Sequence, residues 1–161
     1  MNERQRVYEM LDEFDTAMLV THGIDGRFEG RPMQMAEVEP AGPIWFFTSR
    51  DSRKIAEIEA DPKALLVFED EHNQYLSISG TARVLEDPAR VRRLWKDAFK
   101  VWFPEGVEDP DLVLMAVEPE VAEFWDTRGT NRLEYIFDAA KAYVTGERPS
   151  DDGDRHGRTD V

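Results

Sequence analysis

Apolar residues recur with two different periods along the chain, and these periods predict helices and strands in separate segments. Near the N-terminus they recur every three or four positions, which predicts an amphipathic helix. They are Val7, Met10, Leu11 and Phe14. Asn2 and Gln5 lie three positions apart just before them and match a capping box, so we expect the helix to begin there.

Short apolar runs separated by turn residues predict that most of the remaining chain is β-strand. The expected strands are residues 17–22, 28–38, 44–48, 63–70, 75–85, 112–119 and 121–127. Pro119 separates the last two, and Gly80 predicts a bulge. Pro32 removes one backbone donor from the second strand, which indicates an edge, a bulge or a place where something other than a strand meets the backbone.

Three further segments carry helical signals. After the strand at 44–48, Asp51 or Ser52 can cap a helix that Pro62 ends. Residues 87–102 begin with an Asp cap followed by Pro and predict one continuous helix. Apolar spacing between residues 133 and 144 predicts a last helix, closed by Gly146.

The predicted elements make an α+β fold in which six or seven strands, mostly linked as hairpins, form an antiparallel barrel with helices outside it. A chain of 161 residues favours a single domain. We expect that domain to span residues 1–146. Residues 147–161 have no apolar periodicity and are predicted to be a disordered tail.

Composition and charge narrow the classes of function. The net charge of -14 disfavours nucleic acid and anionic membrane surfaces as partners. No run of about 18 apolar residues exists and the N-terminus is polar, so we expect a cytoplasmic protein. With 0 Cys, thiolate chemistry and Cys-based metal sites are excluded. The three histidines are widely separated, so their spacing indicates no metal site.

The strongest candidate chemistry lies in residues 46–54, FFTSRDSRK, where an acidic chain gathers hydroxyls and cations. A strand that ends in Thr48 and Ser49 leads into a helix whose first turn contains Ser52, Arg53 and Lys54. Free amides and the dipole at a helix start favour a phosphate, and charged donors strengthen the contact. A phosphate monoester is the expected ligand. In the alternative interpretation Ser52 only caps the helix and the nearby cations are solvated.

Several motifs in order also carry a family resemblance. Residues 47–62, FTSRDSRKIAEIEADP, resemble the phosphate-binding strand and helix of the pyridoxamine 5'-phosphate oxidase superfamily, the FMN-binding split barrels. With GRPM, YLSISGTA, LWK, WFPEG and EFWD, residues 1–146 are similar to the general stress protein branch of that superfamily. The resemblance implies a homodimer of six-stranded split barrels with FMN in the dimer interface.

The resemblance also implies which residues bind the cofactor. The residues that would hold the phosphate are Arg31, Ser52, Arg53 and Lys54. Those that would line the ribityl chain are Thr48 and Ser49, and those beside the isoalloxazine ring are Pro32, Met33 and Gln34. Trp125 would lie near the flavin, and the partner subunit could contribute this residue. The plainer alternatives are a surface ion pair for Arg31, core packing for Met33 and interface packing for Trp125.

Two departures from the oxidases bear on activity. Tyr75 stands where they carry a flavin-contacting Gln, and residues 154–158, DRHGR, only superficially resemble their pyridoxal phosphate motif. Oxidation of vitamin B6 is therefore not expected. The resemblance favours a flavin-dependent oxidoreductase that uses NADH or NADPH and a small acceptor, with no catalytic side chain required. The alternatives are a flavin-binding or sequestering protein without turnover, and a relative that binds the deazaflavin F420.

Overall fold

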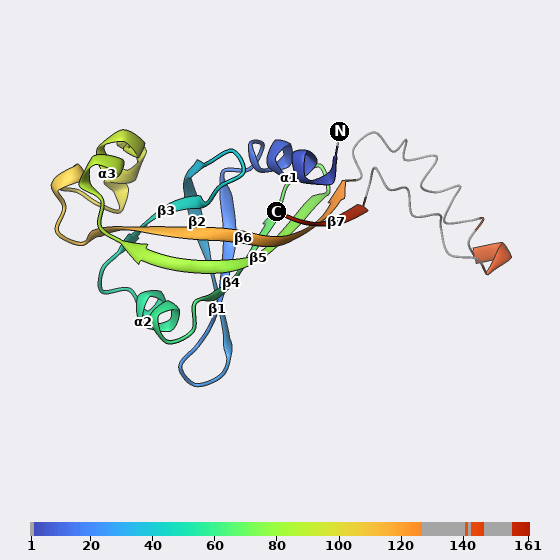
Figure 1. Cartoon of the computed structure of the whole chain (residues 1–161), viewed down its shortest axis with the longest axis horizontal. Coiled ribbons are helices and arrows are strands. Elements are labelled where there is room, and N and C mark those ends of the chain that lie inside the picture. The colour runs from blue at the N-terminus through green and yellow to red at the C-terminus, as the bar shows by residue number, and fades with distance from the viewer. Residues whose placement is uncertain (1, 127–140, 142, 147–155) are drawn as a thin grey trace.

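One antiparallel sheet curls until its third and sixth strands meet, which closes a barrel of six strands (Figure 1). The computed structural model describes residues 2–126, 141, 143–146 and 156–161. The strands are β1 (Thr16–His22), β2 (Phe28–Val38), β3 (Ile44–Ser49), β4 (Lys63–Glu69), β5 (Gln74–Leu85), β6 (Leu112–Asp126) and β7 (His156–Asp160). Their order in the sheet is β3-β2-β1-β4-β5-β6-β7, so β7 extends the sheet beyond the closed barrel.

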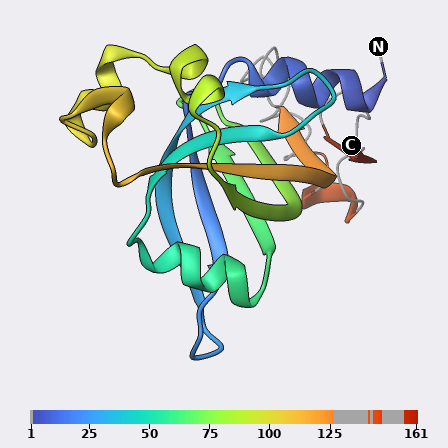
Figure 2. The ribbon, with the colours of Figure 1, turned by 60° about the vertical axis from the view of Figure 1, so that its left-hand side comes forward.

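Helices close the two ends of the barrel and cover one side of it. They are α1 (Glu3–Leu11), α2 (Arg53–Ala60), α3 (Pro88–Leu94) and the 3₁₀ helices η1 (Asp97–Val101) and η2 (Gly106–Glu108). Figure 2 shows α1 and α2 at opposite ends of the barrel. The predicted capping box at Asn2 and Gln5 is confirmed. None of the described helices is long and apolar enough to cross a membrane.

The barrel interior holds the main core, and a second apolar cluster lies outside it. In β1 the alternating residues Ala17 and Leu19 point inward, as expected for a strand with one buried face. Strand β3 is buried on both faces, because Phe46 packs inside the barrel while Trp45 and Phe47 pack under α3 and η1. This double burial holds the end of β3, where the candidate phosphate site begins, in a fixed position.

The prediction of two strands separated by Pro119 is wrong, because residues 112–126 form the single strand β6. The pairing between β5 and β6 shifts register between Ser79 and Gly80, opposite Pro119. The predicted irregularity at Gly80 is thus confirmed, but the extra residue of the bulge is Glu120 of β6 and not Gly80 itself. A Cβ at Gly80 would lie 2.1 Å from the carbonyl oxygen of Glu118, so only glycine fits this close approach.

The prediction of one continuous helix over 87–102 is also wrong. Helix α3 ends at Leu94, Trp95 has an extended backbone, and the chain resumes as η1. The break lets the Trp95 ring pack against both Phe47 and Phe99, with ring centroids 5.9 Å apart in each pair. Aromatic packing outside the barrel therefore outweighs the helical propensity of this segment.

The predicted disordered tail is wrong for its last residues, since 156–160 form β7 along the edge of β6. This pairing uses backbone groups and needs no apolar pattern. Gly157 lies opposite Phe124, and a Cβ there would come within 2.6 Å of the phenyl ring. The expected helix at 133–144 lies mostly outside the described residues, as do residues 147–155.

Candidate functional site

Strand β2 has two halves that differ in their neighbours. Residues 35–38, the closed half, pair with β3 at residues 44–46 and complete the barrel wall. Residues 28–34, the open half, pair only with β1, while Phe47–Ser49 pair only with β6. The wall is split between these two segments. Pro32 lies in the open half, where one edge of the strand has no strand partner and proline is tolerated.

A pocket of about 320 Å³ lies at this split. Seven of the ten residues predicted to bind the cofactor line it, namely Arg31, Pro32, Met33, Gln34, Thr48, Ser49 and Lys54. A larger cavity of about 530 Å³ lies on the outer face of the sheet, between β1, β4 and β5. Among the described residues that line that cavity, Lys63 is the one lysine and there is no arginine, so the cationic end of the split pocket better matches a phosphate.

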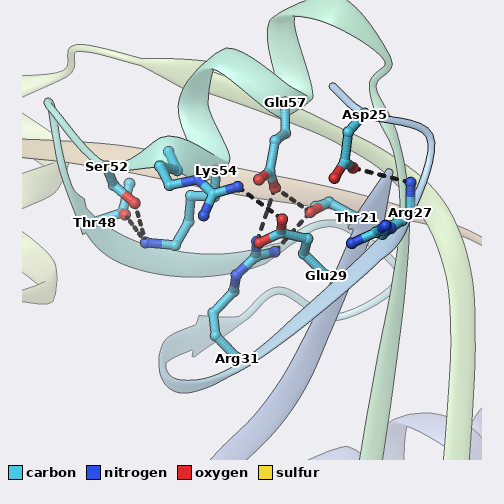
Figure 3. A network of polar contacts seen from close by, with 10 residues as sticks. Thr21, Asp25, Arg27, Glu29, Arg31, Thr48, Ser52, Lys54 and Glu57 are labelled. Atoms are coloured by element: carbon cyan, nitrogen blue, oxygen red, sulfur yellow. Dashed lines mark hydrogen bonds and ion pairs between the residues drawn. The ribbon is translucent and has the colours of Figure 1, made fainter. Parts of the chain in front are cut away.

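Lys54 lies at the polar end of the pocket, in the first turn of α2. Its Nζ donates hydrogen bonds to Thr48 Oγ1 at 2.9 Å and to Ser52 Oγ at 2.7 Å (Figure 3). Burial lowers the pKa of Lys54 and the charge of Arg31 lowers it further, while Glu57 opposes both effects. A bound anion would favour the charged form of Lys54 and so oppose this lowering of its pKa. The ammonium group is therefore suited to a negative ligand.

Ser52 is the N-cap residue of α2, but its side chain makes no capping hydrogen bond. Of the two predicted caps, Asp51 and Ser52, the structure has Ser52 at the cap position, but its hydroxyl accepts a hydrogen bond from Lys54 instead of capping the helix. The first amides of the helix lack a side-chain acceptor, and such amides are suited to an anion.

Arg31 belongs to a buried polar triad with Thr21 and Glu57 (Figure 3). Its guanidinium donates to Thr21 Oγ1 at 2.7 Å and to Glu57 Oε2 at 2.8 Å, and the Thr21 hydroxyl donates to the same Oε2 at 2.6 Å. Burial raises the pKa of Glu57, yet these hydrogen bonds and the charges of Arg31 and Arg53 bring it below its ordinary value. Glu57 is therefore a charged, buried partner of Arg31.

Arg53 differs from the other two cations because its side chain is 79% exposed. Its guanidinium forms an ion pair with Glu29 Oε1 at 2.7 Å. Two of the three predicted phosphate-binding cations, Arg31 and Arg53, are thus paired with carboxylates. The alternative interpretation, in which the cations are solvated, describes Arg53 better than Arg31 or Lys54. Lys54 contacts only hydroxyls in the hydrogen bonds of its side chain.

Aromatic residues line the other end of the pocket. They are Phe47, Phe99, Trp102 and Phe103. Phe47 and Phe99 meet edge to face with centroids 4.7 Å apart, and Trp102 at the rim is 68% exposed. The sequence did not predict this wall, because Phe99 and Trp102 were assigned to one long helix over 87–102 and Phe103 to the loop after it.

Sequence reasoning also missed Thr21 and Glu57. A signal for Thr21 exists, since it continues the inward alternation of Ala17 and Leu19 and so predicts a polar group inside the barrel. Glu57 carries a weaker signal, its position beside Ile58 on the buried side of α2. A glutamate in a short helix on the outside of a barrel is usually solvated, which explains the omission.

Trp125 lies away from the split pocket of its own chain. It pairs in register with Tyr75, and both rings are partly exposed on the outer face of the sheet. The His156 ring stacks on Trp125 with centroids 5.2 Å apart and an interplanar angle of 10°. Within one chain, the structure therefore does not bring Trp125 to the other predicted residues.

The histidines have polar partners. His22 Nδ1 lies 2.7 Å from Asp61 Oδ2, and its ring packs on Phe28 with centroids 4.8 Å apart. His156 Nε2 lies 2.9 Å from Glu123 Oε1. His72 lies in the exposed turn between β4 and β5, with Nδ1 3.6 Å from Asp70 Oδ2. Among the described residues, no group of three or more His, Asp or Glu side chains is arranged to hold a metal ion.

The fold and the split between β2 and β3 define the class of protein, a six-stranded antiparallel split barrel with flanking helices. The chain belongs to the family described as pyridoxamine 5'-phosphate oxidase like, whose family model matches residues 2–150.

Relatives within this family agree with the assignment. General stress protein 26 of Bacillus subtilis is 28% identical over 123 residues, which cover 73% of this chain and 84% of that protein. The structure of a general stress FMN/FAD binding protein from Xanthomonas citri is 32% identical, with a TM-score of 0.69 over 80% of this chain and 91% of that one. A putative general stress protein 26 from Jannaschia is 26% identical, with a TM-score of 0.70 and coverage of 98% and 96%.

Proposed function

We propose that this protein binds FMN in the split pocket and acts as a flavin-dependent oxidoreductase. The observation that carries the proposal is the pocket itself, which joins a half-buried lysine and a helix start without a side-chain cap at one end to an aromatic wall at the other. Its volume lies within the roughly 300–1,000 Å³ typical of small-molecule sites. The Xanthomonas citri relative, described as FMN/FAD binding, supports the same ligand class.

The residues of the pocket fit a ligand with a phosphate and a flat ring. Lys54, the amides of α2 and Arg31 would hold the phosphate, with Ser49 and Thr48 beside the ribityl chain. Residues 32–34 would run beside the ring, where the backbone edge of β2 has no β3 partner. The ring would then extend toward the outer face of the sheet, because Pro32 and Gln34 are exposed.

Bound FMN would supply the redox chemistry, taking a hydride from NADH or NADPH and passing electrons to a small acceptor. The residues of the chain would bind the flavin, orient it and shield one edge of its ring. No side chain is assigned as a catalytic acid or base.

A second copy of the chain would complete the site. The outer face of β1 and β4 carries Met18, 43% exposed, beside the partly buried Val20, Leu65 and Val67. A contiguous apolar face of this kind favours a protein partner. A homodimer packed through this face would bring Trp125 and Tyr75 of the partner subunit toward the ring in the split pocket. We place this dimer in the cytoplasm.

A second candidate function is flavin binding without turnover, and the carboxylates near the cations favour it. Glu29 and Glu57 partly neutralise the site, which suits a flavin that is taken up and released. Anaerobic mixing of the loaded protein with NADPH separates the two functions. Rapid bleaching of the flavin absorbance supports the oxidoreductase, and an unchanged spectrum supports the binding protein. The spectrum of the bound ligand also distinguishes FMN from F420.

Titration with FMN tests the binding site itself. The Lys54→Met variant should weaken FMN by about tenfold to a hundredfold, because it removes a charge-assisted contact to the phosphate. The control is Lys63→Met, which removes a lysine from the larger outer cavity and should leave FMN affinity unchanged. The reverse result, with Lys63→Met weakening FMN and Lys54→Met neutral, would move the ligand to that cavity.

A further inference from the structure

Glu57 is a buried carboxylate for which the proposed binding of FMN has no direct use. The residue is 1% exposed, and its Oε2 accepts hydrogen bonds from Thr21 and Arg31. Its Oε1 is buried with no hydrogen-bond partner among the described residues. An unpaired buried acceptor is costly, so its presence beside a ligand pocket calls for an explanation.

The charges around the site explain why a carboxylate is present at position 57. Three cations surround the start of α2, namely Arg31, Arg53 and Lys54. Two carboxylates pair with them, Glu57 with Arg31 and Glu29 with Arg53. These five groups sum to a net charge of +1, and a phosphate monoester carries close to two negative charges. The protein therefore meets the phosphate with less positive charge than its sequence suggests.

We propose that Glu57 is a positioning residue and an internal counter-charge for the phosphate site, which fixes Arg31 and keeps phosphate affinity low enough for the flavin phosphate to exchange. This inference rests on the proposed function, and it concerns how that site is regulated. It assigns Glu57 no contact with the flavin.

Geometry separates the two roles of Glu57. The hydrogen bonds from Arg31 and Thr21 hold the guanidinium between β1 and α2, and an amide oxygen in place of Oε2 could accept both of them. The negative charge acts at longer range and repels a phosphate that approaches Arg31. Glu57→Gln keeps the positioning and removes the charge, whereas Glu57→Ala removes both.

The test compares FMN with riboflavin, which has the same ring and no phosphate. We expect Glu57→Gln to tighten FMN by about tenfold, since a unit charge within several ångströms changes an ionic interaction by at least that factor. Riboflavin affinity should stay unchanged. Glu57→Ala should weaken FMN, because Arg31 loses its anchor. The matched control is Glu59→Gln, which removes the same charge from the exposed face of α2, where solvent screens it, and should leave both ligands unaffected.

The outcomes distinguish this inference from the proposed function. If the wild-type protein binds no FMN, the proposed function fails. If the wild type binds FMN but Glu57→Gln leaves its affinity unchanged, weakens it, or shifts riboflavin equally, the counter-charge is refuted.

A paired variant keeps the inference testable if Glu57→Gln does not fold. Arg31→Met combined with Glu57→Met replaces the ion pair by apolar groups, a change that proteins often tolerate, and it leaves the net charge of the site at +1. The inference then expects FMN to weaken by about tenfold through loss of one charged contact, with riboflavin unchanged. Equal FMN affinity in this variant would show that Arg31 does not reach the phosphate and would overturn the inference.

Discussion

The two halves of β2 belong to one strand and have different tasks. The closed half, residues 35–38, pairs with β3 and buries Met35 and Ala36. The open half, residues 28–34, pairs only with β1 and directs Arg31 toward Thr21 and Glu57. In the open half the pairs between β2 and β3 are missing, which leaves room for a polar pocket. The buried ion pair of Arg31 with Glu57 stabilises the exposed edge of β2.

This comparison predicts that apolar burial dominates stability in the closed half. Phe46 lies opposite Met35 and is 0% exposed, so Phe46→Ala should lower the free energy of unfolding by about 3–5 kcal/mol. Gln34→Ala, an exposed position in the open half, should change it by no more than about 0.5 kcal/mol. Urea unfolding measures both. Comparable losses in the two variants would contradict the division of β2.

A smaller effect on the free energy of unfolding is expected at acidic pH, and it should arise from the open half of β2. The pKa of Glu57 is lower in the folded state than its ordinary value. Its contribution to stability is therefore present above the unfolded pKa and is lost as pH falls through the folded one. Glu57→Gln should flatten the dependence of unfolding free energy on pH below about pH 5, the range of an ordinary carboxyl. A variant with the acid dependence of the wild type would mean that the Arg31 pair does not stabilise the open half.

Local patterns in the sequence were sufficient for several elements. The Asn2 capping box and the first two strands joined by a short turn follow from residues close together in the chain. The phosphate-site residues at 48–54 are equally local, because a strand end and a helix start adjoin there. Thr48, Ser49 and Lys54 share one pocket for this reason, whereas residues 31–34 were predicted there from the family resemblance.

Long-range contacts account for the misses. Strand β7 depends on the edge of β6, which a polar tail does not reveal in its own sequence. The helix break at Trp95 depends on packing against Phe47, nearly fifty positions earlier. Glu57, on α2, has its charged partner Arg31 on the distant strand β2. In each case a contact with residues distant in the same chain, and not the local sequence pattern, determines the structure.

The measurement that tests the central claim most directly is a crystal structure of the protein with FMN bound. The account predicts a phosphate within hydrogen-bond distance of Lys54 Nζ and the first amides of α2, and a flavin ring beside residues 32–34 of β2. A phosphate bound elsewhere, such as near Lys63 in the outer cavity, or a ring distant from the open half of β2 would contradict it.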